Sequence, residues 1–359
     1  MRSILFNAGP AALPEAVLHQ AAQAMIEIPG EGQSIAEISH RSRFFENVLD
    51  EFKQLFRNLL HIPESHDILI VQGGARLQFA LIPLNFLPAN KTAAFIDSGY
   101  WAHTAMEYAS FGNQTECIAS SKTQYYRQLP NFDPKKIDKQ QHAYLYLCSN
   151  NTIYGTQYHT FPQVDIPLII DMSSDILSKP IHFTHIDLAF ACAQKNIGPA
   201  GFSVVIVKKS FLETAQTQLA PALSYKHQAA KHSNDVTNPI IAIYTALLNL
   251  RHLHDTGGVA AAQERNSQKA HSLYTELDRN SLFNAPVNPT DRSQMNVCFF
   301  AKQEQHHQAF LTYCQTQNIK GIKGHIQAGG FRASLYNAVT QEMVNELIAA
   351  LRDFEKLHG

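Results

Sequence analysis

The sequence predicts an α/β fold in two parts: a large domain on a mostly parallel sheet flanked by helices, and a smaller α+β domain after it. Short unbroken apolar runs alternate with helical or loop segments over the first two thirds of the chain, as expected for strands buried on both faces. This alternation stops at Gly257-Gly258. The 359 residues allow two domains, since one usually takes roughly 100–200 residues. We expect a large domain over 15–258 and a small domain over 259–359, joined by the N-terminal segment 1–14.

Two helices are expected before the first strand. Pro14 suits the first turn of one, and apolar residues follow it at helical spacing. A clearer apolar stripe covers 48–59, and a third helix is expected over 75–86, after Gly73-Gly74. The strands expected in the large domain are 67–71, 93–97, 143–148, 167–171, 187–193 and 202–208.

The rest of the chain is expected to be mainly helical. A helical run begins at Trp101, and another extends from about 239 to the glycine pair. In the small domain we expect one strand, 295–301, and helices over about 259–280, 306–317 and 340–357.

Composition excludes several classes of protein. Lys and Arg total 29 and Asp and Glu total 30, a net charge of −1, which argues against broad binding of nucleic acid. No apolar run approaches the ~18 residues of a membrane span, and the N-terminus does not read as a signal peptide. The five cysteines never form a CxxC pair, so we expect free thiols and a cytoplasmic protein. The pairs His252/His254 and His306/His307 lack partner ligands at convincing spacing, so no metal site is expected.

Two residues could hold a cofactor. Asp171 ends one expected strand and Lys195 follows the next, so both should emerge at the ligand-binding edge of the sheet. Pyridoxal phosphate (PLP) needs such a pair: a lysine for a Schiff base and a carboxylate that keeps the pyridine nitrogen protonated. Partial burial would favour the neutral amine of Lys195. Taken singly, a strand-end Asp is commonly a turn residue and a loop Lys is usually solvated.

Two further features could serve the same cofactor. Gly73-Gly74 lies between a strand and a helix, where main-chain N–H groups can hold a phosphate. Trp101 follows the next strand and could stack on a pyridine ring. A plain turn and an ordinary core aromatic are the alternatives for these two features. No GxGxxG or GxxxxGK[ST] pattern occurs, which disfavours dinucleotide and P-loop sites.

The chain resembles the phosphoserine aminotransferases, class V enzymes within the fold-type-I PLP proteins (the PLP-dependent transferase type I fold), over nearly its whole length. Taken together and in this order, the matching segments are highly specific. They are FNAGPAALP (6–14), AEISHRSRFF (36–45), VQGGARLQFALIPLNFL (71–87), DSGYWA (97–102), DMSSDILSKP (171–180), AQKNIGPAGFSVVIVKK (193–209), RSQMNV (292–297) and GGFRASLYNA (329–338).

The resemblance implies roles for the cofactor residues. Lys195 would carry the Schiff base, Asp171 would pair with the pyridinium nitrogen, and Trp101 would stack on the ring. The other cofactor contacts it implies are the main chain of Ala75 and Arg76 and nearby Gln194 at the phosphate, Thr152 beside the hydroxyl, and Thr237 from the second subunit of a homodimer.

The resemblance also implies an activity: glutamate and 3-phosphooxypyruvate would give 2-oxoglutarate and O-phospho-L-serine, in serine biosynthesis. Lys195 would also move the proton at the substrate α-carbon. The substrate carboxylate would bind Arg332. The substrate phosphate would bind Arg76 and His325, together with His40 and Arg41 of the neighbouring subunit. Some members of the family also use phosphorylated hydroxythreonine in vitamin B6 biosynthesis.

Three departures from the family pattern leave alternatives open. Ile326 stands where an Arg commonly follows Gly-His, and removing one charge-assisted contact could cost ~1.5–3 kcal/mol of substrate binding. Asn151 and Val236 also replace the usual residues. One alternative is a class V aminotransferase for a non-phosphorylated keto acid. Another is a catalytically weak PLP-binding protein.

Overall fold

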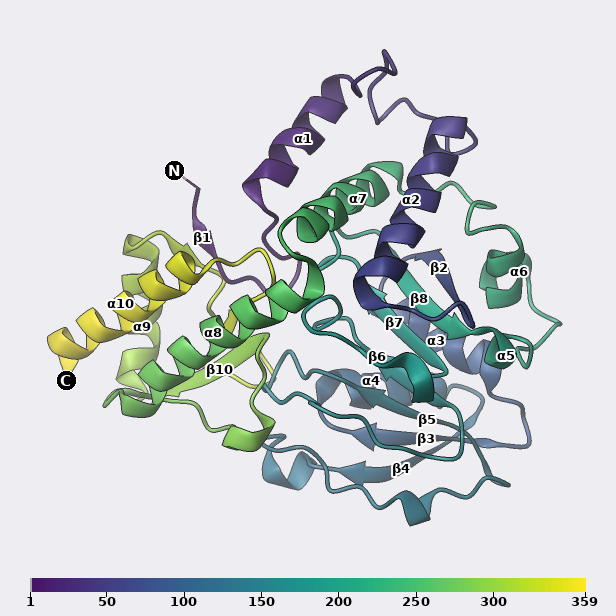
Figure 1. Cartoon of the computed structure of the whole chain (residues 1–359). Coiled ribbons are helices and arrows are strands. Elements are labelled where there is room, and N and C mark those ends of the chain that lie inside the picture. The colour runs from purple at the N-terminus through teal and green to yellow at the C-terminus, as the bar shows by residue number, and fades with distance from the viewer. Residues whose placement is uncertain (1) are drawn as a thin grey trace.

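A seven-stranded sheet forms the centre of the large part of the molecule (Figure 1). The structure is a computed structural model that describes residues 2–359. The strand order is β2-β8-β7-β6-β5-β3-β4, and only β8 runs antiparallel to its neighbours. The predicted α/β class with a mostly parallel sheet is therefore confirmed. The strands are β2 (His66–Gln72), β3 (Thr92–Asp97), β4 (Gln114–Ser120), β5 (His142–Cys148), β6 (Leu168–Asp171), β7 (Leu188–Cys192) and β8 (Phe202–Lys208).

The edge strand β4 is the one strand of this sheet that the sequence did not predict. Its residues Gln114–Ser120 are mostly polar, and most of them are exposed or half-buried. An edge strand has a partner on one side only and need not be apolar throughout. A search for unbroken apolar runs therefore misses it.

Helices cover both faces of this sheet. One apolar cluster joins α1, α2 and α7 to one face, and another joins α3 and α4 to the opposite face. Their ends follow local rules: Ser42 caps α2 by accepting the N–H of Phe45, and His61 ends it in the left-handed conformation. The helices are α1 (Glu15–Ile26), α2 (Arg43–Leu60), α3 (Ala75–Phe86), α4 (Tyr100–Ala109), α5 (Lys209–Leu212), α6 (Tyr225–Ala230) and α7 (Ile240–Asp255).

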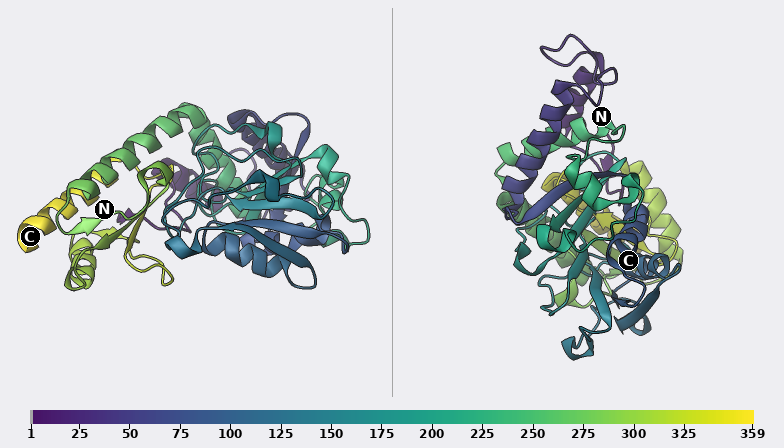
Figure 2. Two further views of the ribbon diagram at one scale, coloured as in Figure 1. Left: turned by 90° about the horizontal axis from the view of Figure 1, so that it is seen from below. Right: turned by 90° about the vertical axis from the view of Figure 1, so that its right-hand side faces the viewer.

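The C-terminal residues form a second body with its own core. Helix α8 (Gly258–Arg279) runs from the large sheet into this body (Figure 2), where aromatic rings such as Phe283, Phe310 and Phe354 pack together. The other elements there are β9 (Phe283–Asn284), β10 (Asn296–Ala301), α9 (Gln305–Thr316), β11 (Ile319–Lys320), β12 (Phe331–Ser334) and α10 (Gln341–His358).

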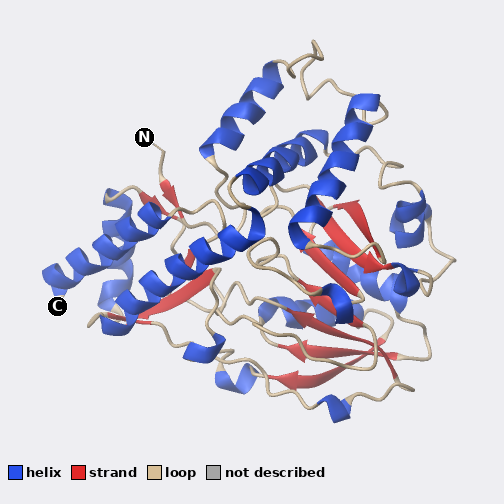
Figure 3. Ribbon diagram, in the orientation of Figure 1, coloured by secondary structure: helices blue, strands red, loops and turns tan. Residues whose placement is uncertain are grey.

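The N-terminal segment lies against this second body. Strand β1 (Ile4–Leu5) pairs in parallel with β11, while β9, β10 and β12 form a separate antiparallel sheet (Figure 3). The division of the chain at 258/259 stays a prediction. None of the helices described within residues 2–359 has the length and apolarity needed to cross a membrane.

Candidate active site

A cavity of about 270 Å³ opens at the carboxyl edge of the large sheet, by the ends of β5, β6 and β7. This edge is where open α/β sheets bind their ligands. Residues from the N-terminal segment, the first turns of α3 and α4, and β12 complete the wall. The structure brings together eight residues singled out in the sequence: Ala75, Trp101, Thr152, Asp171, Gln194, Lys195, His325 and Arg332.

Asp171 is fixed by the register of the sheet. It is the last residue of β6, where it pairs with Cys148 of β5 and Phe190 of β7. Its side chain is buried, and its Oδ1 accepts the N–H of Ser173 at 2.8 Å. Burial raises the pKa of the Asp171 carboxyl, while the charge of Lys195 and the Ser173 bond act in the opposite direction. A buried carboxylate at this point is suited to a cationic partner in the cavity.

Lys195 lies on the loop that follows β7. Its Nζ is 3.5 Å from Oγ1 of Thr152. Burial alone lowers the pKa of Lys195, but Tyr336, Asp171 and two nearby thiols outweigh it and raise the pKa above its usual value. These neighbours, which the apolar flanking sequence does not reveal, oppose the effect of burial on which the prediction of a neutral amine relied.

The first turn of α3 faces the same cavity through Ala75. Gly73 has a φ of +90°, which glycine adopts without strain, and Gly74 caps the helix. The first N–H groups of a helix have no partner within it, so this turn can hold an anion such as a phosphate. The glycine pair is thus both a turn and the start of a candidate phosphate site.

Asn151 fixes the turns that carry Thr152 and Trp101. Its Nδ2 donates to the carbonyl of Ser98 at 2.6 Å, and its Oδ1 accepts the N–H groups of Ile153 and Tyr154, each at 3.3 Å. A Cβ at Gly99 would collide with the Asn151 amide. This departure from the family pattern is therefore a structural residue that ties two walls of the cavity together.

Arg332 and His325 form the side of the cavity that faces the C-terminal body. Nη1 of Arg332, on β12, donates to the carbonyl of Thr152 at 3.3 Å. Its Nε is buried and has no hydrogen-bond partner among the described residues. The ring of His325 lies 5.5 Å from that of Tyr100, and burial followed by the charge of Arg332 lowers the pKa of His325. One fixed guanidinium thus has donor capacity left for an anion.

Four residues named from the sequence do not line this cavity: His40, Arg41, Arg76 and Thr237. The side chains of Arg41, Arg76 and Thr237 are exposed. The carbonyl of His40 accepts from Asn234 at 2.9 Å, and that of Thr237 accepts from Gln72. The 40–41 and 234–237 segments therefore lie near each other, with Thr237 at the carboxyl end of β2.

Other cavity residues were missed in the sequence. They include Gly9, Cys148, Ser173, Ser174 and Cys192. The two serines directly follow Asp171 in a matching segment, so proximity in sequence was the available signal. The two cysteines end strands β5 and β7 on either side of β6, and strand adjacency was the signal for them.

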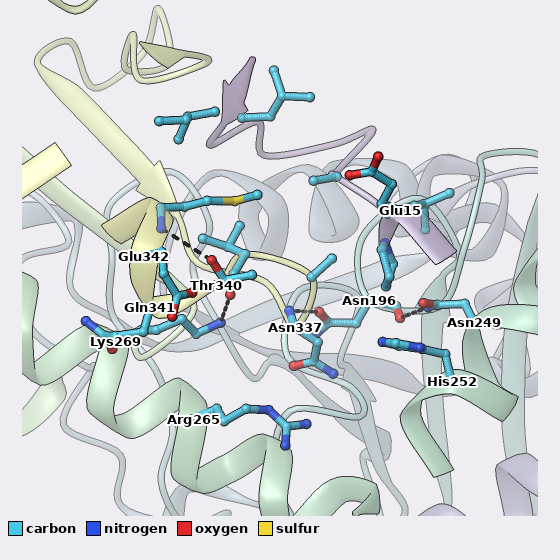
Figure 4. Close-up of a pocket in the computed structure, with 18 of the residues that line it drawn as sticks. Glu15, Asn196, Asn249, His252, Arg265, Lys269, Asn337, Thr340, Gln341 and Glu342 are labelled. Atoms are coloured by element: carbon cyan, nitrogen blue, oxygen red, sulfur yellow. Dashed lines mark hydrogen bonds between the residues drawn. The ribbon is translucent and has the colours of Figure 1, made fainter. Parts of the chain in front are cut away.

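A larger cavity, of about 780 Å³, lies behind the Lys195 loop, between the N-terminal segment, α7, α8 and residues 337–343 (Figure 4). Asn196 links its walls, because it accepts the N–H of Asn337 at 3.0 Å and its carbonyl accepts from Asn249 at 3.0 Å. Buried Lys269 donates to the carbonyls of Leu335, Tyr336 and Val339 at 2.8–3.0 Å. Among the described residues, Lys195 is the one residue predicted for the cofactor or the substrate that also borders this larger cavity; Pro14 and His252 border it too, but neither was assigned a role in the chemistry. The predicted chemistry therefore gathers in the smaller cavity.

Comparison with known proteins identifies the family. Residues 3–347 match the family model of the class-V aminotransferases. The chain is 42% identical to the phosphoserine aminotransferase of Bacillus subtilis, over 99% of each chain. It is also 42% identical to that of Phocaeicola vulgatus, over the full length of both.

Solved structures agree with this result. The phosphoserine aminotransferase from Bacillus circulans subsp. alkalophilus superposes with a TM-score of 0.96 at 37% identity, over 100% of this chain and 99% of that one. PLP-bound phosphoserine aminotransferase from Trichomonas vaginalis gives 0.90 at 35% identity, over 98% and 100%. The chain belongs to the class V aminotransferases and, within them, to the phosphoserine aminotransferases. It is a PLP-dependent transaminase.

Proposed function

We propose that this chain transfers the amino group of glutamate to 3-phosphooxypyruvate, which yields 2-oxoglutarate and O-phospho-L-serine. The observation that carries the proposal is the pairing of Asp171 and Lys195 in the wall of one cavity, delivered by the adjacent strands β6 and β7. The relatives named phosphoserine aminotransferase support the choice of substrates.

The cavity fits PLP by its own chemistry. Asp171 would keep a proton on the ring nitrogen, Trp101 would stack on the ring, and the first turn of α3 with Gln194 would hold the phosphate. Thr152, 3.5 Å from the amine of Lys195, would lie beside the ring hydroxyl. When bound, PLP supplies an aldehyde that takes up the amino group and a ring that accepts the electrons of the substrate carbanion.

Arg332 would bind the substrate, and Lys195 would move its proton. The guanidinium of Arg332 would hold the α-carboxylate in a bidentate pair, in which its buried, unpartnered Nε gains a partner. This orients the α-carbon toward Lys195, whose amine would remove the α-proton and return it on the cofactor side. His325, with its pKa lowered, would donate a hydrogen bond to the acceptor's phosphate from the neutral ring.

A homodimer would complete the phosphate site. His40 and Arg41 lie outside the cavity of their own chain, and Arg41 and Thr237 are exposed. We propose that they reach the cavity of a second copy, Thr237 at the cofactor phosphate and the His-Arg pair at the substrate phosphate. Arg76, exposed at the start of α3, would join the pair. We also propose a cytoplasmic location. A second transamination, with phosphorylated hydroxythreonine as its product, is proposed as well.

A non-phosphorylated acceptor is the second candidate. Ile326, which stands where the family commonly has an Arg, is 92% exposed and does not line the cavity. One chain therefore contributes few cations to a phosphate site. An acceptor panel with glutamate as donor separates the candidates: 3-phosphooxypyruvate should exceed pyruvate and glyoxylate in kcat/KM by about 100-fold or more, the value of two or three charge-assisted bonds. Equal rates with pyruvate would favour the second candidate, and bound cofactor without turnover would indicate a catalytically weak protein.

Lys195→Ala tests the site itself. The variant should lose transamination activity. It should also lose the absorbance band of the cofactor that arises from its covalent bond to the Lys195 amine. A cofactor-loaded and active Lys195→Ala protein would overturn the proposal.

A further inference from the structure

A second carboxyl, that of Asp175, is buried directly behind the candidate cofactor site. Asp175 follows the end of β6 by four residues and is 2% exposed. It does not line the cavity. Neither the sequence patterns nor the proposed function gives this residue a role.

Asp175 is bound to the main-chain frame that carries Asp171. The hydroxyl of Ser149 lies within hydrogen-bond distance of the Asp175 Oδ1 and of the Asp171 carbonyl, 3.0 Å from the latter. The N–H of Ser149 also donates to this carbonyl, at 2.9 Å. Nε2 of Gln157 donates to the other carboxylate oxygen at 3.1 Å. Both oxygens therefore accept hydrogen bonds, and the loop after β5 is held against the end of β6.

The charges around Asp175 balance in pairs. Burial raises the pKa of Asp175 above its usual value, and Lys179, the bonds from Ser149 and Gln157, and Lys195 oppose this only in part. The charge of Asp175 in turn raises the pKa of Asp171 and of the Cys148 thiol. It also raises the pKa of His159, which slightly offsets the lowering of that pKa by burial. When Asp175 is ionised, its charge and that of Asp171 are matched by the ammonium groups of half-buried Lys179 and Lys195. Buried charges require partners of this kind.

We infer that Asp175 is a second carboxylate of the cofactor site, a positioning residue that braces the end of β6 through Ser149 and favours positive charge on the group bound at Lys195. The inference rests on the proposed assignment of Lys195 and Asp171. A fixed negative charge in a poorly solvated interior stabilises a nearby cation with little screening. Removing the charge should therefore lower the pH at which the bound cofactor and its lysine lose their shared proton.

Asp175→Asn is the discriminating variant, since its amide can donate to Ser149 and accept from Gln157. The absorbance of PLP bound to the holoenzyme, titrated from acid to alkaline pH, should show a midpoint lower by about one pH unit than in the wild type. Asp175→Ser removes the charge with a smaller side chain and gives the same readout if the amide variant fails to fold.

Two matched variants separate charge from structure. Glu276→Gln alters another buried acid, which pairs with Arg279 and Arg352 far from this site; it should lower the Tm and leave the midpoint unchanged. Ser149→Ala removes the brace and keeps the charge, so it should weaken cofactor binding with a midpoint near that of the wild type.

An unchanged midpoint in both Asp175 variants would overturn the inference. If Lys195→Ala still abolishes the cofactor absorbance in that case, the proposed function stands and only the role of Asp175 fails. If Lys195→Ala retains the absorbance, the proposed function fails first.

Discussion

The inner wall of the cavity and its outer rim are built in different ways. Asp171 ends a central strand, where ladder hydrogen bonds, buried neighbours and Ser149 fix it, and Lys195 follows the neighbouring strand directly. The residues expected at the substrate phosphate, among them Arg41 and Arg76, lie on exposed segments. Sheet register fixes the position of Asp171 within a single chain. An exposed cation such as Arg41 has no such frame, and the second copy that we propose would hold it at the substrate. The residues proposed for the chemistry of the reaction therefore lie within one chain, whereas the choice of acceptor depends on the second copy that we propose.

The largest effect is expected at the inner wall, from Asp171→Asn. The amide keeps the shape but cannot hold a proton on the ring nitrogen, so transamination should fall by about 10²–10⁴-fold, the range of a lost proton-transfer partner. Asp187→Asn is the matched control, because Asp187 precedes β7 at the opposite edge of the sheet, where it accepts the N–H of Leu168 at 3.0 Å. Steady-state rates with glutamate measure both. A control as damaged as Asp171→Asn would show that the loss is one of stability.

At the rim, Arg41→Ala should reduce kcat/KM for the phosphorylated acceptor by about 10–100-fold, the value of one charge-assisted contact. The rate with a non-phosphorylated acceptor should change little. Equal losses with both acceptors would place Arg41 outside the phosphate site.

Mixing Arg41→Ala with Lys195→Ala subunits sharpens the comparison. In a dimer with shared sites, each hybrid regains one intact site, so an equal random mixture should recover about a quarter of wild-type activity. No recovery after subunit exchange, verified by mass, would show that each chain works alone.

His325 should give a smaller, pH-dependent effect. Burial and then Arg332 lower the pKa of His325. The ring is therefore neutral at pH 7.5 and gains a proton only when the pH falls below the usual pKa of a histidine. That proton adds a positive charge beside the substrate phosphate. Because the added charge strengthens binding, KM for the phosphorylated acceptor should fall by about three- to tenfold as the pH is lowered into the mildly acidic range. His325→Asn should remove this part of the pH dependence. An unchanged profile in the variant would assign the dependence to the substrate itself.

The smallest effect is expected from Ile326→Arg. Because this position is 92% exposed, a new cation there is worth at most about 1 kcal/mol, or about fivefold in kcat/KM for the phosphorylated acceptor. Ile326→Gln controls for side-chain length. A gain of 100-fold would mean that the 322–330 segment folds over the substrate and that the new cation contacts it directly.

The inner wall of the cavity could be predicted from the sequence better than its outer rim. Apolar runs located the central strands, because burial on both faces leaves a plain signal. The expectation of a mostly parallel sheet then placed Asp171 and Lys195 at one edge. The edge strand β4, the bracing role of Asn151 and the raised pKa of Lys195 depend on contacts between distant segments, such as Asn151 with Ser98. No local pattern encodes these contacts. Arg41 and Thr237 lie outside the cavity of their own chain, and no local pattern encodes the second copy that we propose to bring them to it.

The central claim is that the amine of Lys195 carries the cofactor opposite Asp171. Borohydride reduction of the PLP-loaded protein, followed by peptide mass spectrometry, fixes the cofactor to whichever amine holds it. The adduct is expected on Lys195 alone and should be absent from the Lys195→Ala protein. An adduct on Lys179, Lys269 or another lysine of the wild-type protein would contradict the claim.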